Sequence, residues 1–264
     1  MRRRHIVSLQ KTVHFVEKRS RMEQSFVVVD LETTGLNPKK DKIIEIGAIR
    51  VEQGEIVDRF ESFVNPGVKL SERVSELTGI SEEDLEGAPY IEDILPKFME
   101  FEKELPLVGH KVIFDYSFLK HAAVNLGMQF ERTGIDTLRI ARCFMVEQES
   151  KRLPDLCEAL AIEHNPHRAF SDVIATWKLY QYLSETYDKE TLSEAGKQLF
   201  QPKNLVYQVK KEQKATKRQL ERLQRLHEQL GIVPEEDLSR LTRNEASRKY
   251  DQIISQYGTP GKGV

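Results

Sequence analysis

The sequence predicts an α/β protein in which helices cover a mixed β-sheet. Apolar runs typical of strands lie near its beginning, and Gln53-Gly54 separates two of them in the manner of a hairpin turn. Strands are expected at residues 26–31, 43–52, 56–64 and 106–110. Helices are expected near residues 70–77, 81–86, 91–104, 116–126, 137–147, 154–161 and 171–187. Strands followed by alternating helices and strands favour a mixed sheet flanked by helices.

The composition divides the chain into parts. A basic N-terminal extension covers residues 1–25, with either Met1 or Met22 as the true start, and the α/β body covers 26–187. Residues 188–214 are polar and predict a linker, and 258–264 predict a flexible tail. Between them, apolar positions at helical spacing predict a small helical module over 215–257. Its evidence is the series Leu220, Leu223, Leu226 and Leu230, followed by Gly231 and by the helix cap Thr242.

Charge and hydropathy limit the function classes. The net charge is +5 for residues 1–25, −11 for 26–187 and +4 for 188–264. An acidic body with basic ends is untypical of a protein that binds nucleic acid by bulk charge, and it suits carboxylates gathered around metals. No apolar run reaches the length of a membrane span, and no secretory signal is evident. Cys143 and Cys157 lack metal-binding spacing and are expected to be reduced core residues, which favours a cytoplasmic protein.

The first strand ends in two carboxylates. Asp30 and Glu32 are two residues apart, so their side chains point to the same face of the strand. Two acids at the end of a buried strand are costly unless a cation lies between them. Hard divalent ions such as Mg²⁺ prefer oxygen ligands of this kind.

Three downstream residues can join this pair. Asp115 lies where a strand end meets a helix start, and Asp172 is expected in the first turn of the 171–187 helix, with His167 on the preceding loop. Each also has an ordinary structural explanation. Asp115 could cap a helix, Asp172 could be favoured by the helix dipole, and His167 could be a surface histidine. Their order and spacing together favour a shared site.

These motifs resemble a known family. Val29–Gly35, Gly109–Asp115 and His167–Asp172 are similar to the three motifs of the DnaQ-like (DEDDh) 3′→5′ exonuclease superfamily, which includes the epsilon proofreading subunit of bacterial DNA polymerase III. The resemblance covers about residues 26–187, and Leu77–Ile80 also matches its DNA-type branch. It implies a ribonuclease H-like fold. Lys111 and Val173 depart from the residues usual at their positions, and Lys111 leaves the substrate preference open.

The resemblance also implies residue roles. Asp30, Glu32, Asp115 and Asp172 would hold two divalent cations, Mg²⁺ or Mn²⁺, and His167 would act as the general base in phosphodiester hydrolysis. The residues implied to bind the 3′-terminal nucleotides are Thr33, Gly35, Leu36, His110 and Phe114. Core packing is an equally good explanation of Leu36 and Phe114 when the resemblance is set aside.

The predicted function is a metal-dependent 3′→5′ exonuclease that acts on single-stranded or frayed DNA and releases nucleoside 5′-monophosphates. Its expected partners are single-stranded DNA or DNA 3′ ends, and a DNA polymerase or another replication or repair protein. A 3′→5′ exoribonuclease on the same fold is the nearest alternative. A non-catalytic nucleic-acid-binding subunit is disfavoured because no motif residue is missing. Whether the protein proofreads in trans or acts alone stays open, as does its oligomeric state.

The C-terminal module has two interpretations. Ala215–Leu220 and Leu241–Ser247 resemble a short two-helix module that is appended to various bacterial and phage proteins. Residues 210–225 contain seven Lys or Arg and two Glu, so a helix that contacts phosphates is one interpretation. A docking or purely structural appendage is the other, with equal support.

Overall fold

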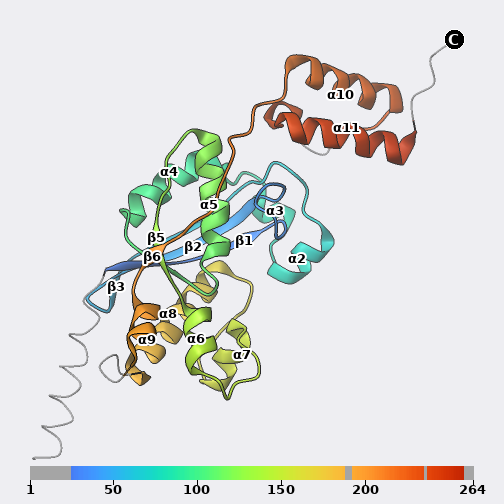
Figure 1. Cartoon of the computed structure of the whole chain (residues 1–264). Coiled ribbons are helices and arrows are strands. Elements are labelled where there is room, and N and C mark those ends of the chain that lie inside the picture. The colour runs from blue at the N-terminus through green and yellow to red at the C-terminus, as the bar shows by residue number, and fades with distance from the viewer. Residues whose placement is uncertain (1–24, 188–191, 235–236, 259–264) are drawn as a thin grey trace, which may run out of the picture.

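A six-stranded mixed sheet forms the centre of the protein (Figure 1). The computed structural model describes residues 25–187, 192–234 and 237–258, so most of the expected N-terminal extension and C-terminal tail lies outside the described residues. The sheet order is β3-β2-β1-β4-β5-β6. The strands are β1 (Phe26–Thr33), β2 (Ile43–Glu52), β3 (Glu55–Phe63), β4 (Leu107–Gly109), β5 (Thr133–Asp136) and β6 (Lys203–Asn204).

Strand pairing confirms the mixed sheet. β1 pairs antiparallel with β2 and parallel with β4, so it lies at the junction between the two pairing modes. β2 and β3 form the expected hairpin, in which Gln53 and Gly54 both have positive φ angles, 51° and 81°. β4 and β5 are parallel, and β6 closes the sheet antiparallel to β5.

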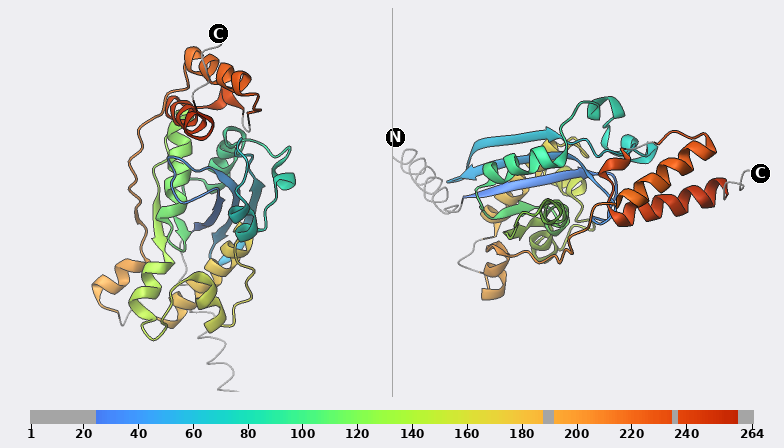
Figure 2. Two further views of the ribbon diagram at one scale, coloured as in Figure 1. Left: turned by 90° about the vertical axis from the view of Figure 1, so that its right-hand side faces the viewer. Right: turned by 90° about the horizontal axis from the view of Figure 1, so that it is seen from above.

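Helices cover both faces of the sheet (Figures 1 and 2). The body contains α2 (Glu72–Thr78), α3 (Glu82–Leu85), α4 (Ile91–Glu102), α5 (Ile113–Leu126), α6 (Thr137–Phe144), α7 (Leu153–Ala159) and α8 (Ala169–Thr186). Val28 packs in a core with residues of α6, α7 and α8, whereas Val27 and Val29 pack with residues of α4 and α5. By strand alternation, Asp30 and Glu32 therefore share the face that α8 covers.

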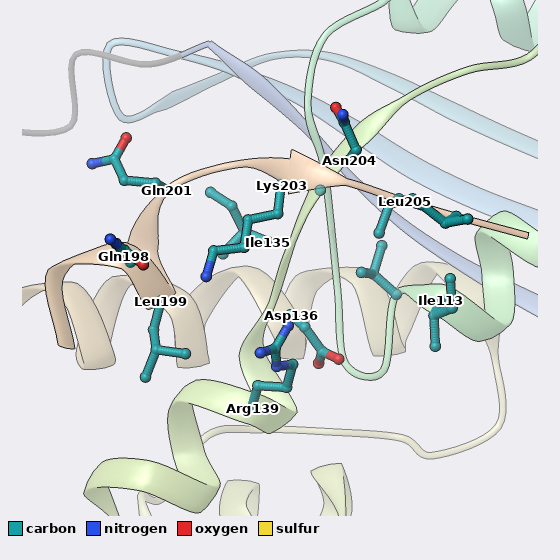
Figure 3. Close-up of a pocket in the computed structure, with 13 residues that line it drawn as sticks. Ile113, Ile135, Asp136, Arg139, Gln198, Leu199, Gln201, Lys203, Asn204 and Leu205 are labelled. Carbon is teal, nitrogen blue, oxygen red and sulfur yellow. The ribbon is translucent and has the colours of Figure 1, made fainter. Parts of the chain in front are cut away.

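The residues after α8 add to the sheet instead of leaving it. Within the stretch expected to be a polar linker, the structure has α9 (Glu194–Lys197), a 3₁₀ helix (Gln198–Phe200) and β6. Phe200 is buried, with its ring 5.9 Å from that of Phe144. A cavity of about 290 Å³ remains where this segment meets β5 and α6, and Figure 3 shows Gln198, Lys203 and Asp136 among its lining residues.

Two features of this body differ from what the sequence predicted. β5 and β6 were not predicted, because both are short and β5 contains Gly134, which weakens a strand pattern. Cys143 is exposed, on the outer side of α6, whereas Cys157 is buried as expected.

The C-terminal module is a helical pair with its own small core. It consists of α10 (Lys217–Leu230), a 3₁₀ turn (Leu238–Arg240) and α11 (Arg243–Tyr257). Capping boxes at Thr216 and Thr242 begin the two helices. Leu223, Leu226 and Ile253 are buried between them. Across the described ranges, every helix is too short or too polar to cross a membrane.

Candidate active site

The end of β1 brings two carboxylates to the α8 face. Glu32 is buried, with 8% of its surface exposed, and Asp30 is partly buried. The site begins where the sheet changes from antiparallel to parallel pairing, because Asp30 pairs with Gly47 of β2 while Val28 pairs with Val108 of β4.

Asp115 is attached directly to this strand. The backbone N–H of Leu31, between the two acids, donates a 3.1 Å hydrogen bond to Asp115 Oδ1. Helix α5 was expected to begin at residue 116, but it begins at Ile113. Asp115 therefore lies in its first turn and does not cap it. The buried carboxylate therefore joins α5 to the strand that carries Asp30 and Glu32.

The start of α8 reaches the same place because β2 has a glycine there. A Cβ on Gly47 would lie 2.6 Å from the backbone carbon of Ala169, so only glycine permits this approach. Asp172 lies in the first turn of α8, as expected, and is buried. Its Oδ2 accepts a 3.2 Å hydrogen bond from the backbone N–H of His167, and its Oδ1 contacts the ring Nε2 of His164.

His167 completes the cluster. Its φ angle of 64° is in the left-handed region, which is uncommon for a residue with a side chain. One ligand atom from each of Glu32, His167 and Asp172 lies within 4.8 Å of the others. Strand β1 and the loop before α8 thus bring together groups that are more than a hundred residues apart in the sequence.

The sequence interpretation missed two residues of this site. Glu45 on β2 is buried, and its two oxygens accept hydrogen bonds from the Arg168 side chain at 3.2 Å and the Ala169 backbone at 3.1 Å. The ring of His164 is almost fully buried against Asp172. The acid inside the apolar run Ile43–Ile49 was a signal for Glu45, because a lone buried charge needs partners. His164 carried no such signal.

Acidic groups held close together dominate the electrostatics of the site. Burial raises the pKa of Glu32 to about 8, and the negative charges of Asp172 and Glu45 add to the shift. Burial likewise raises the pKa of Asp115 to about 8. The pKa of Asp30 is raised too, first by burial and then by Asp115 and Asp172. Each carboxylate is thus destabilised by the others in its charged form.

Three residues implied to bind the substrate lie at the end of β1 and on the loop after it. Thr33 Oγ1 donates a 2.7 Å hydrogen bond to the Gly35 carbonyl. A Cβ on Gly35 would lie 2.5 Å from the carboxylate of Asp41, which explains the glycine. Leu36 is 84% exposed, so core packing does not explain this leucine.

The other two residues implied to bind the substrate are Phe114, in the first turn of α5, and His110, directly after β4. Phe114 is half-buried, with its ring 5.0 Å from that of Phe118. The ring of His110 lies 2.9 Å from Thr137 Oγ1 through Nδ1 and 2.7 Å from the Lys151 carbonyl through Nε2. Burial lowers the pKa of His110, and Nε2 of the neutral ring donates to that carbonyl, while the Thr137 hydroxyl donates to the Gly109 carbonyl at 3.2 Å. Both ring nitrogens of His110 are therefore occupied.

The donor set fits hard divalent cations. Asp30, Glu32, Asp115 and Asp172 offer carboxylate oxygens, which Mg²⁺ and Mn²⁺ prefer, and His167 adds a single imidazole. The raised pKa values are the second indication, because a cation between these groups would relieve the repulsion that produces them. The side chains present thus match the implied metals in chemistry and in charge.

Comparison with known proteins identifies the family. The family model RNase_T, described as "Exonuclease", matches residues 27–180, more than half of the chain. The chain therefore belongs to this family of exonucleases, which are DnaQ-like.

Relatives agree with this assignment. The PolC-type DNA polymerase III of Caldanaerobacter subterraneus subsp. tengcongensis is 43% identical over 166 residues, covering 62% of this chain and 12% of that protein. Its counterpart in Bacillus subtilis is 40% identical over 172 residues, covering 63% and 12%. The chain thus spans only about an eighth of the length of these relatives.

Solved structures support the fold. Exonuclease I of E. coli, solved with an oligonucleotide, matches with a TM-score of 0.55 and 19% identity. The match covers 63% of this chain and 41% of that one. The mixed sheet with flanking helices is accordingly a ribonuclease H-like exonuclease fold, as the sequence predicted.

Proposed function

We propose that this protein is a 3′→5′ exodeoxyribonuclease of the DEDDh type that removes nucleoside 5′-monophosphates from single-stranded or frayed DNA. The observation that carries the proposal is the meeting of Glu32, His167 and Asp172 within 4.8 Å, beside Asp30 and Asp115. A nuclease role follows from the family, and the finer activity rests on this arrangement.

Asp30, Glu32, Asp115 and Asp172 would hold two divalent cations, Mg²⁺ or Mn²⁺. Bound there, the cations would neutralise the phosphate and act as Lewis acids in its hydrolysis. His167, with its ring at the edge of the cluster, would take a proton from the attacking water. His164 and Glu45 would position Asp172 and the 167–169 loop through the contacts described above.

The 3′ end of the substrate would be bound by the loop after β1. The exposed side chain of Leu36 is available to insert between the last two bases, and the backbone around Thr33 and Gly35 would contact the terminal nucleotide. Phe114 would line the same groove. His110, with both ring nitrogens occupied, would support the groove by packing and not by direct hydrogen bonds to the substrate.

Partners and organisation extend the proposal. The curated relatives are DNA polymerases, which supports DNA 3′ ends as the substrate and a replication or repair protein as a partner. A cytoplasmic location fits such partners. We further propose that the exonuclease domain expected over residues 26–187 extends through β6, and that 215–257 form a separate appended module, with the basic N-terminal extension and the tail as accessory segments.

The decisive experiment compares matched single-stranded DNA and RNA oligonucleotides that carry a 5′ label. With Mg²⁺ or Mn²⁺, the DNA is expected to shorten progressively from its 3′ end, and a chelator should stop the reaction. Faster degradation of RNA would favour the exoribonuclease alternative. Binding without cleavage would favour the non-catalytic one.

Two substitutions test the residue roles. Asp30→Asn should abolish activity, and His167→Ala should lower kcat by about 10²–10⁴-fold. Asp93→Asn, at an exposed position of α4, is the matched control and should retain activity. Near-native cleavage by Asp30→Asn would refute the assignment of that residue.

A further inference from the structure

The C-terminal module touches the loop that carries Leu36. We call residues 34–42, between β1 and β2, the β1–β2 loop. Lys42 Nζ at its end lies 2.6 Å from Glu245 Oε1 of α11. The chain reaches this position along α5, where the backbone N–H of Glu212 donates to Asn125 Oδ1 at 2.8 Å (Figure 2).

Glu245 has two tasks at once. Its Oε2 accepts a 2.8 Å hydrogen bond from the Thr242 backbone, which completes the capping box of α11, while its Oε1 pairs with Lys42. Burial alone would raise its pKa, but Lys42 and Thr242 outweigh burial and the pKa of Glu245 is lowered. The side chains of Lys42 and Glu245 are 39% and 14% exposed, so salt screens this ion pair less than a pair of fully exposed groups.

Lys42 is also hydrogen-bonded to Thr34, which is next to the residues proposed to bind the substrate. Its backbone N–H donates to Thr34 Oγ1 at 2.9 Å, and its carbonyl accepts from the Thr34 N–H at 2.9 Å. Thr34 lies between Thr33 and Gly35. Inside the loop, Asp41 Oδ2 accepts from the Asn37 N–H at 2.7 Å. A short series of contacts thus links α11 to the residues after Glu32.

The module has a second, independent attachment. The Arg240 guanidinium lies 3.4 Å from the centre of the Tyr90 ring and pairs with Glu92 at the start of α4. A cavity of about 450 Å³ lies between this attachment and Lys42. Because Arg240 keeps its contacts with Tyr90 and Glu92, loss of the Lys42–Glu245 pair should free the β1–β2 loop without detaching the module.

We propose that Glu245 is a positioning residue of the exonuclease, which acts through Lys42 to hold the β1–β2 loop in the shape that receives the 3′-terminal nucleotide. The proposal rests on the proposed function. It assigns the module a role in substrate binding without any contact of its own with DNA.

Limited proteolysis of the full chain tests the link to the loop without relying on activity. Lys39 and Lys40 are exposed tryptic sites in the β1–β2 loop. Glu245→Gln keeps the capping box, because Gln serves at that position, but removes the charge that faces Lys42. Trypsin should cleave at Lys39 or Lys40 about two- to fivefold faster in this variant, the range expected from one ion pair.

The matched control is Glu221→Gln, which removes the partner of Lys217 within α10, 3.9 Å away, and touches nothing in the loop. Its cleavage rate at Lys39 and Lys40 should equal that of the unmodified protein. Neither substitution adds or removes a tryptic site. Equal rates for Glu245→Gln and the unmodified protein would overturn the proposal.

Kinetics supply the second readout. Glu245→Gln and Lys42→Met should each raise KM for a single-stranded oligonucleotide about two- to fivefold with kcat unchanged, and the double variant should be no worse than either. Additive effects, or an unchanged KM in an active enzyme, would overturn the role of Glu245 alone. Absence of nuclease activity in the unmodified protein would overturn the proposed function with it, while proteolysis would still show whether the link to the loop exists.

Discussion

Glu32 and Glu45 face each other across β1 and β2, and both carboxylates are buried. Glu32 belongs to the group that includes His167 and Asp172. Glu45 instead uses both oxygens to hold Arg168 and Ala169, the residues that follow His167. One acid is thus available to a cation, and the other fixes the loop that carries the proposed base.

Glu45→Gln is expected to lower kcat by about 10–100-fold while the protein stays folded. The amide offers one acceptor where the carboxylate offered two, so either Arg168 or the Ala169 N–H loses its partner. The measurement is steady-state cleavage of a single-stranded DNA oligonucleotide. Glu76→Gln, exposed on α2, is the control, and equal activity of the two variants would contradict this role of Glu45.

Metal-free protein is expected to lose stability as pH rises from 7 to 8.5. Glu32 and Asp115, with pKa values of about 8, keep protons in the folded state that the unfolded chain releases near pH 4. The folded state binds more protons, so the free energy of unfolding falls with rising pH, by about 1.4 kcal/mol per group for each unit below pH 8.

Urea unfolding in the presence of a chelator measures this effect. Glu32→Gln should flatten the decline, and Mn²⁺ should stabilise the unmodified protein most at the upper end of the range. Glu76→Gln, exposed on α2, should leave the profile unchanged. A stability that stays constant between pH 7 and 8.5 would show that the two carboxylates are already ionised.

Leu36→Ala should weaken substrate binding without destabilising the protein. The side chain is 84% exposed, so its loss should change the free energy of unfolding by less than about 0.5 kcal/mol. KM for single-stranded DNA should rise, because base stacking against this residue is lost. Val57→Ala, another exposed apolar position, should alter neither quantity, and a large loss of stability in Leu36→Ala would indicate packing instead.

Glu102→Ala is expected to destabilise the fold by about 3–5 kcal/mol. Glu102 is fully buried, and its Oε1 and Oε2 lie 2.9 Å and 3.0 Å from Arg132 Nε, so the substitution leaves a buried guanidinium without its counter-charge. Equilibrium urea unfolding measures the loss. Asp155→Ala, which removes the half-buried partner of the exposed Arg152, should cost far less.

Much of the fold could be predicted from the sequence because local patterns agree with it. The apolar run Phe26–Leu31, the Gln53-Gly54 turn and the capping residue Ser81 each describe the structure that forms. β6 could not be predicted. Its two exposed residues have no strand pattern, and their pairing with β5 is a contact between segments far apart in the sequence.

The candidate site was predicted where motif and geometry coincide. Asp30, Glu32, His167 and Asp172 meet as expected, since strand alternation and the start of α8 fix their directions. Glu45 and His164 could not be predicted, because they contact the site through partners that the local sequence does not indicate. The hydrogen-bond partners of His110 likewise come from other segments, at Thr137 and Lys151.

The sixth strand has a practical consequence for anyone who trims this protein. The family match ends at residue 180, yet β6 covers the outer edge of β5, and Phe200 fills the space beside Phe144. A fragment that ends at the family boundary would expose the unpaired edge of β5 and the apolar surface that Phe200 covers. Both would promote self-association. The smallest well-behaved catalytic piece should therefore extend to at least residue 206.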